Sequence, residues 1–401
     1  MVEMKKYKLG DIADFNKESL SKKDSMDVIE YLDTGNLTEN IFGPMQILSR
    51  QEAPSRAKRR VLDKTILYST VRPRLKHYGF MEKPGENTVV STGFVTIDVK
   101  DDFKNIIDSY YLYLLLTQDK ITEYLGTIAD TAVSSYPSLN PSDIQMLEFE
   151  FPNISTQKGI ASVLYTLNKR IENLRAQNRV LESTAKTIYD YTFLQCAGHQ
   201  TTYNKTLNRN IPVGWEIDNL YRIADFTNGL ACQKYRPITE KEKLPVIKIR
   251  EMHDGVTADT EFVRSDIPEK VIVNPGDLLF SWSASLEVMM WNGVKGGLNQ
   301  HIFKVTPKEY FSLYYVYFQL KDYIGNFKRM AEARKTTMGH ITIDHLNQSR
   351  IAIPDEETMK RFSSLVTPLF KKQLVNSQQI EALTTQRNTL LPLLMTGQVE
   401  V

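Results

Sequence analysis

The chain contains little cysteine and no long apolar run, and both absences exclude classes of protein. Its two cysteines, Cys196 and Cys232, are too few for a disulfide framework or a cysteine-rich zinc site. The longest apolar run, Tyr110 to Leu116, is far shorter than the ~20 residues of a membrane-spanning helix. The N-terminal residues lack the apolar core of a signal peptide. We therefore expect a cytoplasmic protein with no membrane partner.

The sequence also lacks the motifs of the common catalytic sites. It has neither a Gly-x-Gly-x-x-Gly nor a Gly-x4-Gly-Lys-Ser/Thr phosphate loop. Residues 140–142 (Asn-Pro-Ser) lack the second proline and the ring of the Asn-Pro-Pro-Tyr motif of adenine methylation. Residues 102–104 (Asp-Phe-Lys) have the spacing of many metal-dependent nucleases, but no upstream Pro-Asp accompanies them. His340 and His345 have no obvious third metal ligand. We expect no catalytic residue, no metal site and no cofactor bound by this chain.

The composition that is present fits a folded protein with two domains. The 401 residues are 41% hydrophobic and 24% charged, which is enough to bury two cores of ordinary size. The net charge is only +2, so any surface for nucleic acid has to come from local clustering of basic residues.

The most informative feature is a repeat of roughly half the chain. Four segments of the first half recur in the same order in the second, at an offset that drifts from about 211 to 202 residues. The matched pairs are residues 9–15 and 220–226, 63–69 and 275–281, 110–113 and 314–317, and 149–152 and 351–354. A duplication of this kind predicts one architecture used twice, with loops of different length.

Each half predicts the same order of elements. Strands are expected where apolar, β-branched and aromatic residues gather, at residues 28–32, 65–69, 87–99, 245–249, 277–281 and 301–305. A helix follows in each half, over residues 109–124 and 313–330. A polar loop and a last strand ending in Pro152 or Pro354 complete the half. The expected fold class is α+β, with two β-rich domains related by a pseudo-two-fold axis.

Each half then closes with a long helix that has a coiled-coil pattern. The repeating positions are Ile160, Leu164, Leu167, Ile171, Leu174, Asn178, Leu181, Ala185, Ile188 and Thr192, and 202 residues later Phe362, Val366, Leu369, Gln373, Asn376, Ile380, Leu383, Arg387, Leu390 and Leu394. A 3.5-residue period over four to five heptads predicts a coiled-coil seam. The first helix would span roughly 48 Å at ~1.5 Å per residue, long enough to act as a ruler.

An antiparallel pairing of the two helices sets Asn178 opposite Asn376. A buried Asn pair in an apolar seam can fix the register at some cost in stability. Pro368 removes one backbone hydrogen bond from the second helix and should kink it. One such helix alone would favour dimerisation or plain packing. Two matched helices, each after a matched domain, favour an intramolecular brace.

Two segments of the first half are rich in side chains suited to DNA. The candidate contacts are Arg56, Lys58, Arg59, Arg60, Ser69, Thr70, Arg72, Arg74 and Lys76. Lysine and arginine neutralise phosphates, arginine can also read guanine, and hydroxyls position the backbone. The competing interpretation of each segment is a solvated charged loop.

A second set of candidates lies in the polar loop after the domain helix and near the strands of the second half. They are Ser134, Ser135 and Tyr136 in the first half, and Ser281, Trp282, Ser283, Gln300, His301, Arg334, Lys335, Thr336, Thr337 and His340 in the second. The two polar loops occupy the same place in the repeat but differ in sequence, as expected of two readers with different targets. Gln300 suits an adenine edge. Trp282 could pack against a sugar or groove wall, or could equally be buried.

Across nearly its whole length the sequence resembles the specificity subunits of type I restriction-modification systems. The resemblance rests on the duplicated domain, the strand that ends in Pro152 before Gln157, the central helix over residues 157–193, and the ending over residues 390–397 (Leu-Leu-Pro-Leu-Leu-Met-Thr-Gly). Residues 356–360 (Glu-Glu-Thr-Met-Lys) depart from the usual glutamine-bearing start of the second helix, which puts the edge of that helix in doubt.

The resemblance implies a division into four regions and a role without catalysis. The regions are a first target-recognition domain over residues 1–153, a central helical region over 154–198, a second target-recognition domain over 199–355 and a C-terminal helical region over 356–401. Each domain would read one half of a bipartite, asymmetric site on double-stranded DNA, and the paired helices would set the spacer between the halves.

The resemblance also implies partners that carry the chemistry. The helices would dock two modification subunits, which bind S-adenosylmethionine and methylate adenine, and restriction subunits would join to use ATP and Mg for translocation and cleavage. Two alternatives remain open at this point. One is the target-recognition partner of a type II enzyme with combined cleavage and methylation, and the other is a duplicated scaffold with no role in nucleic-acid binding.

Overall fold

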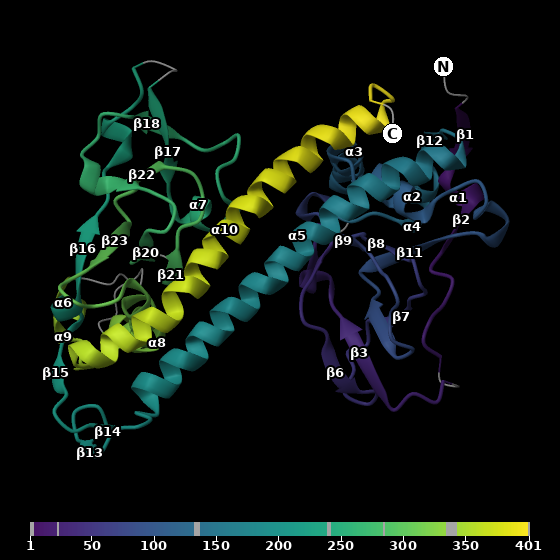
Figure 1. Ribbon diagram of the computed structural model, residues 1–401. Coiled ribbons are helices and arrows are strands. Elements are labelled where there is room, and N and C mark those ends of the chain that lie inside the picture. Colours follow the sequence, from purple (N-terminus) through teal and green to yellow (C-terminus); the bar gives the residue numbers. More distant parts are fainter. Residues whose placement is uncertain are drawn as a thin grey trace. The chain divides into compact units, whose positions relative to one another are not determined.

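The structure is a computed structural model that describes residues 4–21, 24–131, 137–238, 242–283, 285–333 and 343–399. It divides into two compact units (Figure 1). Unit 1 comprises residues 1–172 and 383–401, and unit 2 comprises residues 173–382. The boundaries fall inside two long helices, α5 (Ile154–Tyr189) and α10 (Glu356–Met395). Each unit therefore contains a β-rich domain and one part of each long helix.

The domain of unit 1 is built on two four-stranded sheets. The first has the order β2-β11-β8-β9 and is antiparallel throughout, and the second has the order β6-β3-β10-β7 with β3 and β10 parallel. Their bounds are β2 (Ala13–Phe15), β3 (Val28–Leu32), β6 (Gln46–Ser49), β7 (Ala57–Arg60), β8 (Ile66–Ser69), β9 (Tyr78–Phe80), β10 (Thr88–Ser91) and β11 (Phe94–Val99). Two strand pairs complete the β-structure, namely β1 (Lys5–Lys8) with β12 (Glu148–Phe151) and β4 (Leu37–Thr38) with β5 (Ile41–Phe42).

The domain of unit 2 repeats this topology. Its sheets have the orders β16-β23-β20-β21 and β18-β17-β22-β19, again with one parallel pair, β17 with β22. The bounds are β16 (Ala224–Asn228), β17 (Lys243–Ile247), β18 (Phe262–Arg264), β19 (Ile272–Val273), β20 (Leu278–Ser281), β21 (Glu287–Met290), β22 (Gly296–Leu298) and β23 (Ile302–Pro307). The last strand, β24 (Ile351–Ile353), pairs with β15 (Glu216–Asp218) as β12 pairs with β1. The predicted duplication is confirmed at the level of strand order.

The shorter helices follow the same repeat. Unit 1 has α1 (Leu9–Ile12), α2 (Ser109–Leu116), α3 (Asp119–Asp130) and α4 (Pro141–Gln145). Unit 2 has α6 (Leu220–Ile223), α7 (Ile249–Asp254), α8 (Leu313–Ala333) and α9 (Ile343–Gln348). The hairpin of β13 (Thr201–Asn204) and β14 (Arg209–Pro212) follows α5 and was not predicted.

Several predicted elements differ from the structure, and three of the differences have a clear structural cause. The single helix expected over residues 109–124 is two helices, because the backbone leaves helical geometry at Gln118, which has an extended conformation. The strand expected over residues 87–99 is two strands in different sheets, joined by the turn at Thr92 and Gly93. The central helix begins at Ile154 rather than Gln157, because the Asn153 side chain accepts a hydrogen bond from the Thr156 amide at 2.9 Å and caps it.

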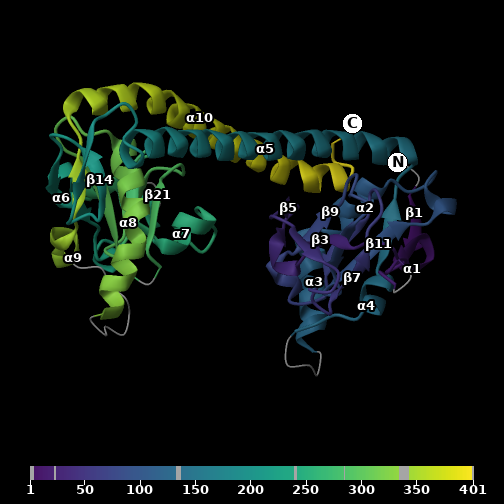
Figure 2. The same cartoon turned by 90° about the horizontal axis from the view of Figure 1, so that it is seen from below.

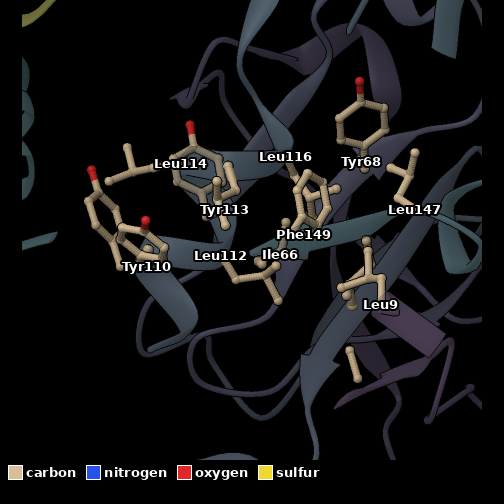
Figure 3. Close-up of a cluster of buried hydrophobic side chains, with 14 of the residues drawn as sticks. Leu9, Ile66, Tyr68, Tyr110, Leu112, Tyr113, Leu114, Leu116, Leu147 and Phe149 are labelled. Carbon is tan, nitrogen blue, oxygen red and sulfur yellow. The ribbon is translucent and has the colours of Figure 1, made fainter. Parts of the chain in front are cut away.

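The hydrophobic core of unit 1 contains side chains from its strands, from its shorter helices and from both long helices. Ile66 and Tyr68 of β8, Leu112 of α2 and Phe149 of β12 belong to one buried cluster (Figure 3). The same cluster includes Leu164 of α5 and Leu394 of α10, together with partly buried Leu390 and Leu391. The C-terminal part of α10 is thus held to the N-terminal part of α5 by the core of this domain.

The two long helices run antiparallel within unit 2. Asn376 is fully buried, and its Nδ2 donates to Asn178 Oδ1 at 3.0 Å, while Asn178 Nδ2 donates to Ser377 Oγ at 3.1 Å. Further along, the Phe193 and Phe362 rings lie 4.9 Å apart. The predicted Asn178–Asn376 register is confirmed. Helix α10 is continuous through Pro368 and begins at Glu356, where Asp355 caps it by accepting from the Thr358 amide at 2.8 Å.

Candidate nucleic-acid interface

The turn between the two sheets of unit 1 brings both basic segments together. The Thr92 amide donates to the Arg56 carbonyl at 2.8 Å, and the Thr70 amide donates to the Gly93 carbonyl at 2.9 Å. Arg56 precedes β7 and Thr70 follows β8, so residues 56–60 and 69–76 meet at this turn although they are separate in the sequence. We call this region the unit 1 edge.

Strand β7 presents the basic side chains of the unit 1 edge. Lys58 is exposed, and the side chains of Arg56 and Arg60 make long ion pairs, Arg56 with Asp33 at 3.5 Å and Arg60 with Glu18 at 3.8 Å. Solvent-exposed pairs of this kind contribute about 0–1 kcal/mol, so phosphates can compete with these carboxylates. Burial of Arg59 lowers the pKa of its guanidinium, and its Nε has no hydrogen-bond partner among the residues that the structure describes.

In the connection from β8 to β9 (residues 70–77), most of the candidate DNA-contacting residues make contacts within the protein. Ser69 is buried, and its hydroxyl donates to the Val71 carbonyl at 3.0 Å, while the Thr70 hydroxyl donates to the Gly93 carbonyl at 3.1 Å. Arg72 is exposed. These contacts tie the connection to the turn at Thr92 and Gly93.

Arg74 and Lys76 are paired with carboxylates on neighbouring elements. Arg74 contacts Glu123 and Asp130 of α3 at 2.8 and 2.6 Å, and the hydrogen bonds to these carboxylates raise the pKa of the guanidinium. Burial opposes the charge of Lys76, but hydrogen bonds donated to Asp119 and Glu39 outweigh it and raise the pKa of the ammonium group. Both side chains therefore carry a full positive charge that is already compensated.

Unit 2 gathers its candidates at the equivalent place. The turn from β22 to β23 carries Gln300 and His301, and the Trp282 amide after β20 donates to the His301 carbonyl at 3.3 Å. The Trp282 and His301 rings lie 5.5 Å apart, and Gln300 Nε2 lies 3.3 Å from His301 Nε2. We call this region the unit 2 edge. It is poorer in positive charge and richer in amide and aromatic groups than the unit 1 edge.

Two candidates of the unit 2 edge are buried. Ser281 is fully buried and its hydroxyl donates to the Ser285 carbonyl, and Ser283 is 8% exposed. Trp282 is half-buried, and its packing against a sugar or groove wall stays a prediction.

The remaining candidates cannot be placed. Ser134, Ser135, Tyr136, Arg334, Lys335, Thr336, Thr337 and His340 lie outside the described residues. Helices α3 and α8 end shortly before these residues. In each unit, the C-terminus of that helix lies on the side away from α5 (Figure 2).

One residue of the unit 2 edge was not predicted. Asn228, at the end of β16, accepts a hydrogen bond at Oδ1 from the Trp282 indole nitrogen at 3.2 Å and so fixes the direction of the ring. The repeat aligns Asn228 with Lys17, at the offset of 211 residues that matches Leu9 with Leu220. No pairwise signal between residues 228 and 282 exists in a single sequence.

Neither edge contains, among its described residues, a group of side chains that could hold a metal ion. Among the residues that the structure describes, no three His, Cys, Asp or Glu side chains are grouped so as to hold a metal ion. No helix in the same parts of the chain is long and apolar enough to cross a membrane. What the edges offer chemically is hydrogen bonding, positive charge and ring stacking.

Comparison with known proteins identifies relatives over the full length. The sequence is 23% identical over 467 aligned residues to the type I restriction enzyme HindI specificity subunit of Haemophilus influenzae, with all of both chains covered. It is 27% identical over 367 residues to the type I restriction enzyme MjaIX specificity subunit of Methanocaldococcus jannaschii, covering 88% of this chain and 81% of the relative.

The fold has a solved counterpart. The S subunit of a type I restriction-modification system from M. genitalium superposes with a TM-score of 0.57 at 14% identity, covering 98% of this chain and 96% of that one. Residues 1–183 and 212–385 match the family described as the type I restriction modification DNA specificity domain. These two matches cover both repeats, and the chain belongs to the type I restriction-modification DNA specificity family.

Proposed function

We propose that the chain is the non-catalytic, sequence-reading subunit of a type I restriction-modification complex. Each unit reads one half of a bipartite, asymmetric site on double-stranded DNA. The main support is the matching position of the two edges, since each lies at the turn between the two four-stranded sheets of its unit. The scaffold is the same, but basic side chains dominate one edge and amide and aromatic groups the other, so two different half-sites follow.

The partners follow from the same proposal. Two modification subunits dock on α5 and α10, bind S-adenosylmethionine and methylate adenine, and restriction subunits add translocation and cleavage with ATP and Mg. Apolar side chains on these helices that remain exposed, Val180 at 65% and Leu365 at 51%, suit such docking. A complex that acts on the chromosome of its host works in the cytoplasm.

Substitution of Gln300 by Ala is expected to relax only the half-site read by unit 2. An amide that pairs with an adenine edge discriminates against the wrong base by about 1–3 kcal/mol, so methylation should spread to sites that differ at one position of that half. The measurement is single-molecule mapping of adenine methylation in a host that carries the variant.

Gln348→Ala is the matched control, because Gln348 is exposed on α9 and is not one of the residues of the unit 2 edge. The control should leave the motif unchanged. Relaxation of both half-sites by Gln300→Ala, or of neither, would count against separate reading by the two units.

A further inference from the structure

The connection between β8 and β9 has a strained backbone for a segment without glycine. Arg72 and Lys76 adopt left-handed conformations, with φ of 48° and 55°, on either side of the short helical turn Pro73–Leu75. Residues other than glycine adopt this region only when their surroundings hold them there. Something outside the connection must therefore keep residues 70–77 in place.

Arg74, between the two strained residues, lies flat on one face of α3. Its Nε and Nη1 donate to Glu123 and Asp130 at 2.8 and 2.6 Å, and Nη2 lies 3.5 Å from Thr127 Oγ1. Residues 123, 127 and 130 are spaced four and three apart, so they share one face of the helix. The planar guanidinium with its several donors can span two carboxylates that lie about two helical turns apart, and a lysine ammonium cannot.

Gly126 provides the room for this contact. A Cβ atom at residue 126 would lie 2.8 Å from Arg74 Cζ and 2.9 Å from Arg74 Nε. Glycine is unfavourable inside a helix compared with alanine, and Gly126 lies well inside α3. The helix thus has a less stable residue at the one place where the guanidinium lies against its backbone.

Backbone hydrogen bonds also tie the connection to residues 137 and 139, which follow α3 in the sequence. The Arg72 amide donates to the Pro137 carbonyl at 3.0 Å, and the Leu139 amide donates to the Thr70 carbonyl at 2.8 Å. Asp130, which Arg74 holds, is the last residue of α3. Residues 70–74 therefore hold both the C-terminus of α3 and residues 137–139.

We propose that Arg74 is a positioning residue for DNA reading by unit 1 and not itself a phosphate contact. Its clamp on α3 over Gly126 holds Thr70, Arg72 and the turn at Gly93 in the arrangement that meets DNA. This inference rests on the proposed function. It differs from the initial interpretation of Arg74 as a DNA-contacting residue, and the two roles give different salt dependences.

The test measures binding of the complex of this chain with its modification subunits to a duplex with the cognate site and to a scrambled duplex, over a range of salt concentrations. Arg74→Ala is expected to lower affinity for the cognate site about tenfold. The slope of log affinity against log salt should stay unchanged, because no phosphate contact is lost. Arg74→Lys, which keeps the charge, should bind as poorly as Arg74→Ala.

Gly126→Ala provides an independent test that alters no charge. It should lower cognate affinity like Arg74→Ala without lowering the thermal unfolding midpoint, since alanine favours the helix. The double variant should be no worse than Arg74→Ala alone, because the added methyl group then meets no guanidinium.

Two results overturn the assignment. One is a slope that falls by about one phosphate contact in Arg74→Ala and is restored in Arg74→Lys, which marks a direct contact. The other is unchanged cognate binding in Arg74→Ala and Gly126→Ala. Failure of the proposed function would differ from both, since the unaltered complex would then not prefer the cognate duplex to the scrambled one.

Discussion

Insertion of one heptad into each long helix should lengthen the unread spacer of the DNA site by about three base pairs. Seven helical residues add roughly 10.5 Å at ~1.5 Å per residue, and successive base pairs of B-DNA are ~3.4 Å apart. The insertions belong between Glu172 and Asn173 in α5 and between Ala382 and Leu383 in α10, where the chain passes from one compact unit to the other.

The heptad preserves the pairing of the helices because seven residues return the seam to the same face. Both half-sites should remain the same bases, since neither edge is altered. The measurement is the methylated motif of the variant. A two-residue insertion in both helices is the control, because at 3.6 residues per turn it rotates the seam by roughly 200° and should abolish methylation rather than lengthen the spacer. An unchanged motif in the heptad variant would refute the ruler.

Neutralisation of Arg56, Lys58 and Arg60 to glutamine should produce the largest loss of DNA affinity. If each of the three side chains neutralises a phosphate, the slope of log affinity against log salt should decrease by roughly 2.7, at ~0.9 per contact. A change of this size corresponds to a large loss of binding at physiological salt, for specific and non-specific duplexes alike. The carboxylates now paired with Arg56 and Arg60 lie near the surface, so the domain should stay folded.

The control removes the same charge elsewhere in unit 1. Lys5, Lys104 and Lys120 are exposed and lie outside the unit 1 edge. Their replacement by glutamine should leave the salt slope nearly unchanged. Equal loss in the two triple variants would show that net charge, rather than the unit 1 edge, drives binding.

The parts of the fold that the sequence predicted are those with a regular signal. The heptad pattern alone predicted that Asn178 lies opposite Asn376, because a 3.5-residue period leaves few registers that bury the apolar seam. The duplication predicted the matching sheets, since paired segments recur in order. The break between α2 and α3 was missed because it falls at Thr117 and Gln118, and neither residue is a proline or glycine that would mark the end of a helix.

The candidate interface was predicted less well, for a physical reason. Charge density selected Arg56, Lys58 and Arg74 alike as candidates, but it could not show which basic side chains are held by carboxylates far away in sequence, as Arg74 is by Glu123 and Asp130. Small hydroxyl residues such as Ser69 and Ser281 match DNA-binding composition, yet both end buried strands. Asn228 could be recognised as part of the unit 2 edge only from its hydrogen bond with Trp282.

The most direct test of the central claim is single-molecule mapping of adenine methylation in the host genome, with the gene intact and deleted. The proposed function predicts that deletion removes one bipartite motif, two short half-sites separated by unread bases, and leaves every other methylated motif in place. Reintroduction of the gene together with that of its modification subunit should restore that motif. An identical set of methylated motifs in all strains, with the methyltransferase expressed, would contradict it.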